Sequence, residues 1–145
     1  MMYLAADHAG FQLKEEIKKY LRELGMEGED LGAYRFNPDD DYPDFIIPVA
    51  KKVGEDPTNN RGIVFGGSGQ GEAMAANKVK GIRAAVYYGG PLDIVKLSRQ
   101  HNNANILSLG ARFLTPQQAK EAVKIWLDTA FEGGRHQRRI LKIEN

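Results

Sequence analysis

Short apolar segments alternate with amphipathic ones along the whole chain, and this alternation limits the fold more than any other feature. The strand candidates are Met2–Ala6, Met26–Leu31, Gly62–Phe65, Ile82–Tyr87 and Ile106–Leu109. Met26–Leu31 is the weakest of these candidates, because it is mostly polar. The other runs are too short for helices, and they lack the polar alternation of a strand with one solvent-exposed face. This pattern predicts a parallel sheet that is buried on both faces, with helices covering it.

The segments between the strands show helical spacing. Leu13, Ile17 and Leu21 recur three or four residues apart, and Gly25 follows as a stop signal. Further helices are predicted over Pro43–Val53, over the residues after Gly71 to about Val79, and over Leu92–Arg99. Thr115 begins the last packed helix as a cap, with Pro116 at its first position. The sequence therefore predicts one α/β domain over residues 1–145, a three-layer Rossmann-like fold with a five-stranded parallel sheet and a C-terminal helical tail.

Charge and composition exclude several classes of protein. Twenty Lys and Arg residues against 19 Asp and Glu residues give a net charge of +1, so no overall field attracts nucleic acid or an anionic membrane. No apolar run approaches the ~18 residues of a membrane span, and the first residues do not have the pattern of a signal peptide. There is no cysteine, which excludes disulfides, thiolate metal sites and a cysteine nucleophile or base. We expect a cytoplasmic protein.

A glycine-rich loop, Gly66–Gly71, follows the third strand. Such a loop lets the backbone approach a ligand closely and turns N–H groups toward an anionic oxygen, and the next helix adds its positive end. It is not a Walker A loop, because Glu72 stands where that motif needs Lys, and no G-x-G-x-x-G pattern fits it. The structural alternative is a tight turn that requires positive φ angles.

Two side chains at this loop have a structural and a catalytic interpretation. Glu72, in the first turn of the helix, is either a partner of the helix dipole or a general base. The helix end lowers the pKa of such a carboxyl, so burial would have to outweigh it to give a base that works near neutral pH. Ser68 is either an N-cap or a donor to a substrate oxygen.

Other charged residues follow the strands or lie in the tail. Asp7 and His8 follow the first strand, where they suit proton transfer or anion binding, although Asp7 also suits a helix cap. His101 follows the end of a helix, where the helix dipole alone would favour a positively charged histidine. The arginines Arg112, Arg135, Arg138 and Arg139 are candidate phosphate ligands or a solvated basic surface. The run Asp39–Asp41 is interpreted as a solvated loop, and no histidine spacing indicates a metal.

Taken together, these residues indicate abstraction of a proton α to a carbonyl group. A small phosphorylated substrate, a carboxylate base and amides facing a developing oxyanion are the parts that this chemistry needs. No cofactor motif is present, which favours isomerisation over redox chemistry.

Seven motifs in order resemble ribose-5-phosphate isomerase of the B type, a family that also holds the galactose-6-phosphate isomerase subunits. They are Asp7–Phe11, Asp41–Asp44, Gly66–Glu72, Ala75–Lys78, Gly81–Ala84, Ser98–Asn102 and Gly134–Arg139. The resemblance covers almost the whole chain. It implies interconversion of ribose 5-phosphate and ribulose 5-phosphate through an enediolate, with no metal and no other cofactor.

The resemblance also implies roles for individual residues. Asp7 or His101 would assist opening of the sugar ring, and Ser68 would hold the enediolate oxygens together with the amides of Gly67, Gly69, Gln70 and Gly71. Asn102 would contact sugar hydroxyls, and Tyr42 would line the sugar pocket. His8, Arg112, Arg135 and Arg139 would bind the phosphate. The family forms homodimers or dimers of dimers whose active sites are shared between subunits.

One position separates two branches of this family. Many members carry a catalytic Cys at the position of Gly66, whereas a second branch uses a Glu directly after the glycine loop. The resemblance to the second branch implies that Glu72 is the base.

Three alternatives remain open from the sequence. The substrate could be a hexose 6-phosphate such as allose or galactose 6-phosphate, since one extra carbon is discriminated only weakly by a pocket. The chain could also be a non-catalytic sugar-phosphate binding module, because a fold does not determine a function. Lastly, it could be one subunit of a hetero-oligomeric isomerase.

Overall fold

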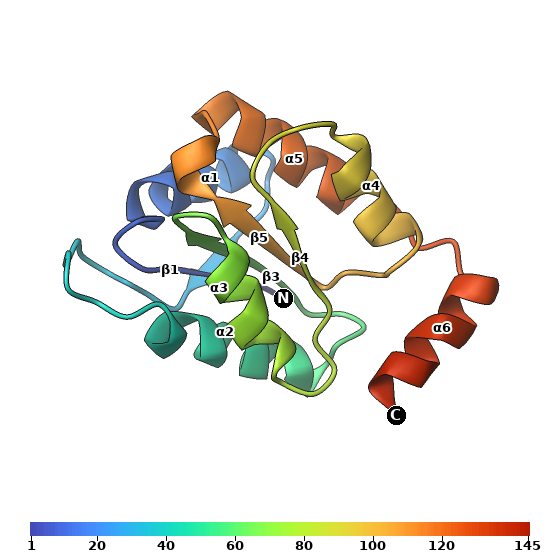
Figure 1. Ribbon diagram of the computed structural model, residues 1–145. Helices are drawn as coiled ribbons and strands as arrows, with labels where there is room; N and C mark the ends of the chain where they lie inside the picture. The colour runs from blue at the N-terminus through green and yellow to red at the C-terminus, as the bar shows by residue number, and fades with distance from the viewer.

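The computed structural model describes all 145 residues and contains five strands, six α-helices and one 3₁₀ turn (Figure 1). The strands are β1 (Met2–Ala6), β2 (Gly28–Asp30), β3 (Arg61–Gly66), β4 (Ala84–Tyr87) and β5 (Ile106–Gly110). The α-helices are α1 (Phe11–Glu23), α2 (Pro43–Glu55), α3 (Gln70–Asn77), α4 (Asp93–Gln100), α5 (Pro116–Asp128) and α6 (Arg135–Glu144). The 3₁₀ turn is Ala111–Phe113.

All five strands are parallel, in the order β2-β1-β3-β5-β4, which confirms the predicted sheet. Ala6 pairs with Phe65 and Phe65 pairs with Leu109, so the central strands end at one common edge. The chain leaves β1 toward β2 on one side of the sheet, and it leaves β3 toward β4 at the opposite edge before it returns to β5. The switch point of the sheet therefore lies between the carboxyl ends of β1 and β3, where α/β proteins place their ligand sites.

Neighbouring strand residues point to opposite faces, and both faces are buried. Leu4 and Phe65 belong to a core layer formed with α1, α4 and α5, whereas Val64 belongs to a second layer formed with α2 and α3. This is the three-layer arrangement that Figure 1 shows. The predicted Thr115 cap is present at α5: its hydroxyl accepts from the N–H of Gln118, and the Gln118 side chain accepts from the N–H of Thr115, which completes a capping box.

Two strands, β2 and β4, are shorter than the ranges predicted for them, Met26–Leu31 and Ile82–Tyr87. None of the helices combines the length and the apolar character that a membrane span requires. β2 and β4 are the edge strands, so each has a ladder partner on one side only. The tail forms the helix α6, which lies beyond the end of α5 (Figure 1). Only His136 and Ile140 of α6 are buried, and Glu144 pairs with Arg83 at 2.7 Å.

Candidate active site

The loops that follow β1 and β3 meet at the switch point of the sheet. Gly10 packs directly on Phe65, so that a side chain at position 10 would overlap the backbone there. The carboxylate of Asp7 is near enough to Glu72 to influence its ionisation. Three of the predicted site segments, after β1, β3 and β5, therefore lie at the same edge.

Glu72 is buried, although it lies in the first turn of α3. Only 4% of the residue is exposed. Burial raises the pKa of its carboxyl above the usual glutamate range; its own backbone N–H works in the opposite direction, and the charge of Asp7 raises the pKa further. Burial thus outweighs the helix end in the free protein, which brings the group toward the ionisation range of a general base.

The carboxylate of Glu72 fills the space beside Gly66. A β-carbon at position 66 would overlap the Glu72 carboxyl group. A cysteine at position 66 and this placement of Glu72 are therefore mutually exclusive. The geometry explains why a thiol and a carboxylate would replace each other as the reactive group of the loop.

The backbone of the glycine loop presents unpaired donors next to this carboxylate. The N–H groups of Gly67, Ser68, Gly69 and Gly71 have no acceptor in the protein. The loop is held from behind, because the Ser108 hydroxyl donates to the carbonyl oxygen of Gly69 at 2.6 Å and the Arg112 N–H donates to that of Gly67 at 3.0 Å. Rigid, unpaired amides are the groups that stabilise a developing oxyanion.

Gly69 and Ser68 explain the geometry of this loop. Gly69 is the N-cap of α3 and has a φ of +80°, a conformation that side chains rarely adopt. Ser68 stands one residue before the cap, and its hydroxyl accepts from the N–H of Gln70 at 3.2 Å. The expected N-cap role of Ser68 is thus taken by Gly69, and the partly buried Ser68 hydroxyl still lies beside the free amides.

Asp7 organises the turn after β1. Its Oδ1 accepts from the N–H groups of Ala9 at 3.0 Å and Gly10 at 3.2 Å. Gly10 itself is the N-cap of α1, without a side-chain cap. The expected alternative, in which Asp7 caps the helix, is therefore wrong: its carboxylate holds the turn that precedes the helix. Its role in ring opening stays a prediction.

His8, Tyr42 and Arg112 surround the loop. The Nδ1 atom of His8 is 2.7 Å from Oδ1 of Asp40, and this hydrogen bond is the main reason that the pKa of His8 is raised. The Arg112 guanidinium lies over Gly67, and the Tyr42 ring lies over Gly71. A β-carbon at position 67 would crowd the guanidinium, and one at position 71 would overlap the ring. Two phosphate candidates and the sugar-pocket candidate are therefore in one place.

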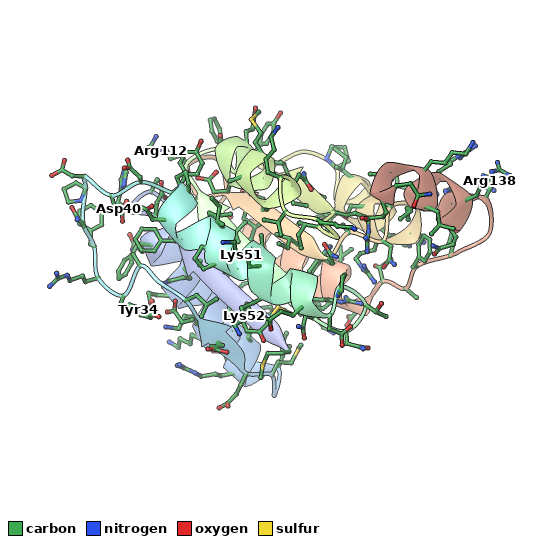
Figure 2. The ribbon with its side chains drawn as sticks, turned by 90° about the horizontal axis from the view of Figure 1, so that it is seen from below. Tyr34, Asp40, Lys51, Lys52, Arg112 and Arg138 are labelled. Carbon is green, nitrogen blue, oxygen red and sulfur yellow. The ribbon has the colours of Figure 1, made fainter.

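The remaining predicted residues lie at the opposite end of the molecule. Helix α4 runs antiparallel to the strands, so His101 and Asn102 at its end lie near the amino edge of the sheet. Arg135 and Arg139 are exposed on α6, without an acidic partner. Figure 2 shows Arg112 beside Asp40 at one end and Arg138 of α6 at the other. One chain does not bring the four phosphate candidates together.

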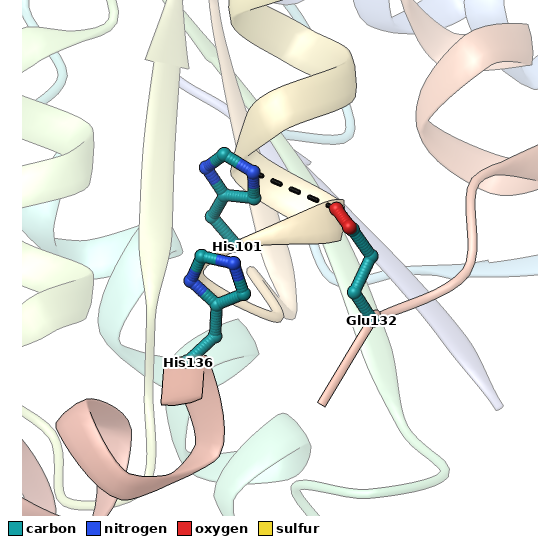
Figure 3. A group of neighbouring side chains, drawn as sticks. All are labelled: His101, Glu132 and His136. Atoms are coloured by element: carbon teal, nitrogen blue, oxygen red, sulfur yellow. Dashed lines mark ion pairs between the residues drawn. The ribbon is translucent and has the colours of Figure 1, made fainter. Parts of the chain in front are cut away.

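His101 belongs to a second cluster, with Glu132 and His136 (Figure 3). Its Nε2 is 3.6 Å from Oε1 of Glu132, and its ring stacks on that of His136 with centroids 4.1 Å apart and planes 11° apart. Burial and the nearby His101 lower the pKa of His136. The lone pairs of two nearly parallel rings do not converge on one point, so this cluster does not present both imidazoles to one metal ion.

Three polar residues near the site were missed by sequence reasoning. Asp40 is turned inward rather than solvated, Ser108 is a fully buried strand residue, and the buried Lys14 donates to Asp30 and to the carbonyl oxygen of Ala33. Ser108 interrupts an otherwise apolar run, which is a usable signal. Nothing in the run Asp39–Asp41 distinguishes its middle residue, and Lys14 occupies an ordinary helical position.

Replacing Glu72 with Gln should make stability less dependent on pH. The folded-state pKa of Glu72 is raised, so the wild type loses stability as the pH rises from the ordinary glutamate value of ~4.3 through the folded-state pKa. Gln does not titrate. The free energy of unfolding of Glu72→Gln minus that of the wild type should therefore increase with pH over this interval and then level off, measured by urea unfolding. If this difference in the free energy of unfolding fell as the pH rises, the Glu72 carboxyl would not have a raised pKa in the folded protein.

Comparison with known proteins shows the family of this chain. Residues 2–143 match the family described as Ribose/Galactose Isomerase. Ribose-5-phosphate isomerase B of Mycobacterium tuberculosis is 44% identical over 140 residues, which cover 96% of this chain and 85% of that protein.

Two solved structures have the same fold over nearly their whole length. Ribose-5-phosphate isomerase B of Mycoplasma genitalium, with bound ribulose-5-phosphate, has a TM-score of 0.95 at 44% identity and covers 99% of this chain and 93% of its own. Ribose-5-phosphate isomerase B of Clostridium thermocellum has a TM-score of 0.92 at 43% identity, and the match covers 99% of this chain and 94% of that one. With its fold and its full length matched in this way, the chain belongs to the ribose/galactose isomerase family.

Proposed function

We propose that this protein interconverts D-ribose 5-phosphate and D-ribulose 5-phosphate, a step of the non-oxidative pentose phosphate pathway. The observation that carries the proposal is the buried carboxylate of Glu72 beside the unpaired amides of the glycine loop. The similar Mycoplasma genitalium protein, which binds ribulose-5-phosphate, supports the choice of substrate. We place the enzyme in the cytoplasm, because phosphorylated sugars are metabolites of that compartment.

The proposed mechanism uses an enediolate intermediate. Once the ring is open, Glu72 removes the proton from C2 of the aldose, and the electrons of that bond move onto the C1 carbonyl oxygen. The free N–H groups of the loop and the Ser68 hydroxyl stabilise the negative oxygen. Glu72 then returns the proton to C1, and the hydroxyl proton on the C2 oxygen passes to the C1 oxygen. The electrons of the double bond form the new C1–H bond as the C2 carbonyl forms, which gives the ketose. Asp7 and His101 are both candidates for opening the ring.

We infer that each active site is completed by a second copy of the chain. His8 and Arg112 lie beside Glu72, whereas His101, Asn102, Arg135 and Arg139 lie at the far end of the same chain. The edge strand β4 and its neighbours expose apolar side chains that a second copy would cover. These are Met74, Tyr88, Ile94, Leu97, Leu141 and Ile143. A homodimer, or a dimer of such dimers, would bring both groups to one substrate.

The purified chain alone should isomerise ribose 5-phosphate with a higher kcat/KM than allose 6-phosphate or galactose 6-phosphate. A coupled assay on the three sugar phosphates measures this ratio. A preference for a hexose phosphate would replace the substrate but keep the reaction. Activity that appears only after a different subunit is added would identify a hetero-oligomeric enzyme, and binding without turnover would identify a non-catalytic module.

A further inference from the structure

Asp40 differs from its acidic neighbours because its carboxylate faces His8. Its Oδ1 accepts both the backbone N–H of His8 at 2.9 Å and the ring Nδ1–H at 2.7 Å. Only 7% of its side chain is exposed, whereas Asp39 and Asp41 are exposed residues. Its second oxygen, Oδ2, is buried and has no hydrogen-bond partner. A carboxylate held in this way, at a cost in solvation, indicates a function beyond loop folding.

We propose that Asp40 is a positioning residue that fixes the His8 ring and keeps it protonated, so that Nε2–H of His8 binds the substrate phosphate. This inference rests on the proposed function, in which His8 is one of the phosphate ligands. Asp40 itself would not touch the substrate.

The chemistry of the two groups sets the direction of the hydrogen bonds. An ionised carboxylate only accepts, so Nδ1 of His8 must carry a proton. Nε2 has no partner in the protein, and 27% of the His8 side chain is exposed. The rings of His8 and Phe36 pack in a T-shaped arrangement, with centroids 6.4 Å apart and planes at 85°. Nε2 is thus left as the free donor of a fixed ring, as in other carboxylate–histidine pairs.

Four influences act on the charge of His8. The hydrogen bond to Asp40 is the largest and raises the pKa; burial lowers it; the charges of Asp7 and Asp40 raise it; and the charge of Arg112 lowers it. The net shift is upward, so the imidazolium persists to higher pH than in an isolated histidine. Two cations, His8 and Arg112, then face the same anionic group, and a phosphate would replace their mutual repulsion with attraction.

The variant Asp40→Asn tests this proposal, because Asn keeps an oxygen acceptor for the backbone N–H of His8 but removes the charge. At a pH between the NMR titration midpoints of His8 in the variant and in the wild type, we expect the Kd for inorganic phosphate and the KM for ribose 5-phosphate to rise by about tenfold or more, the scale of a charge-assisted hydrogen bond. The kcat should change by less than about threefold. Near pH 5.5, where an unassisted histidine is protonated, the variant should approach the wild type.

Two controls show whether Asp40 acts through His8. Asp39→Asn removes the same charge from an exposed neighbour and should leave both constants near the wild-type values. In the double-mutant cycle, adding Asp40→Asn to His8→Asn should cost almost nothing further. The NMR titration of His8 should shift to lower pH in Asp40→Asn.

The proposal is overturned if Asp40→Asn matches Asp39→Asn, if its effect on phosphate binding is independent of pH, or if it persists in full without His8. It is also overturned if the wild type does not bind inorganic phosphate. Phosphate binding and the His8 titration need no turnover. A chain that fails to isomerise ribose 5-phosphate would therefore refute the proposed function while Asp40 is still tested.

Discussion

Replacing Glu72 with Gln should lower kcat for ribose 5-phosphate by about 10²–10⁴-fold, the usual contribution of a general base. Gln has nearly the same shape as Glu but cannot accept the C2 proton. KM should change little, because the loop amides and the phosphate ligands are untouched. Steady-state kinetics in both directions of the reaction measure the effect.

Folding does not confound this experiment. Burial raises the pKa of Glu72, so its ionised form is a cost to the wild type above that pKa, and the neutral amide avoids this cost. Glu23→Gln is a matched control, because Glu23 is exposed at the end of α1 and has no ion pair. If Glu72→Gln keeps a kcat close to that of Glu23→Gln, Glu72 is not the base.

Two inactive variants should restore activity to each other when they are co-expressed. In a dimer with shared sites, Glu72→Gln damages the site at the loop of its own chain, whereas His101→Asn damages the site of its neighbour. A mixed dimer therefore concentrates both defects in one site and leaves the other intact. Random assembly makes about half of the dimers mixed, so we expect about a quarter of the wild-type activity per chain.

The measurement compares the isomerase activity of each separately purified variant with that of the mixed dimer. Two different tags, one on each variant, allow the mixed dimer to be isolated. The isolated mixed dimer should reach about half of the wild-type activity, since one of its two sites is intact. If the mixture is no more active than the sum of the two variants, His101 serves its own chain and the shared site is wrong.

The fold was predictable because its signal is repeated. Each buried strand is a short apolar run, and each helix repeats an apolar stripe, so the layers and the strand types follow from periodicity. The strand order does not follow from it, because the exchange of β4 and β5 at the edge depends on crossovers that no local pattern records. Strands β2 and β4 are short because they lie at the edges of the sheet. Each pairs with one neighbour only, so its length is set by the pairing on that one side.

The site was predictable where chemistry and sequence position coincide. Gly66 and Glu72 are six residues apart at the two ends of the glycine loop, so the absence of a thiol and the presence of a carboxylate can both be read from one short segment. Asp40 and His8 are 32 residues apart, and their contact depends on how the segment before α2 folds back over β1. The division of the phosphate ligands between two ends of the molecule depends on the direction of α4 and the docking of α6, which are tertiary features.

The central claim, that this chain moves a proton between C2 and C1 of ribose 5-phosphate through Glu72, is tested most directly in D₂O. Wild-type protein incubated with ribose 5-phosphate should give ribulose 5-phosphate that carries deuterium at C1, detected by NMR, and Glu72→Gln should not at comparable times. Ketose formed with deuterium at the same rate by Glu72→Gln, or substrate bound by the wild type with neither ketose nor deuterium appearing, would contradict the account.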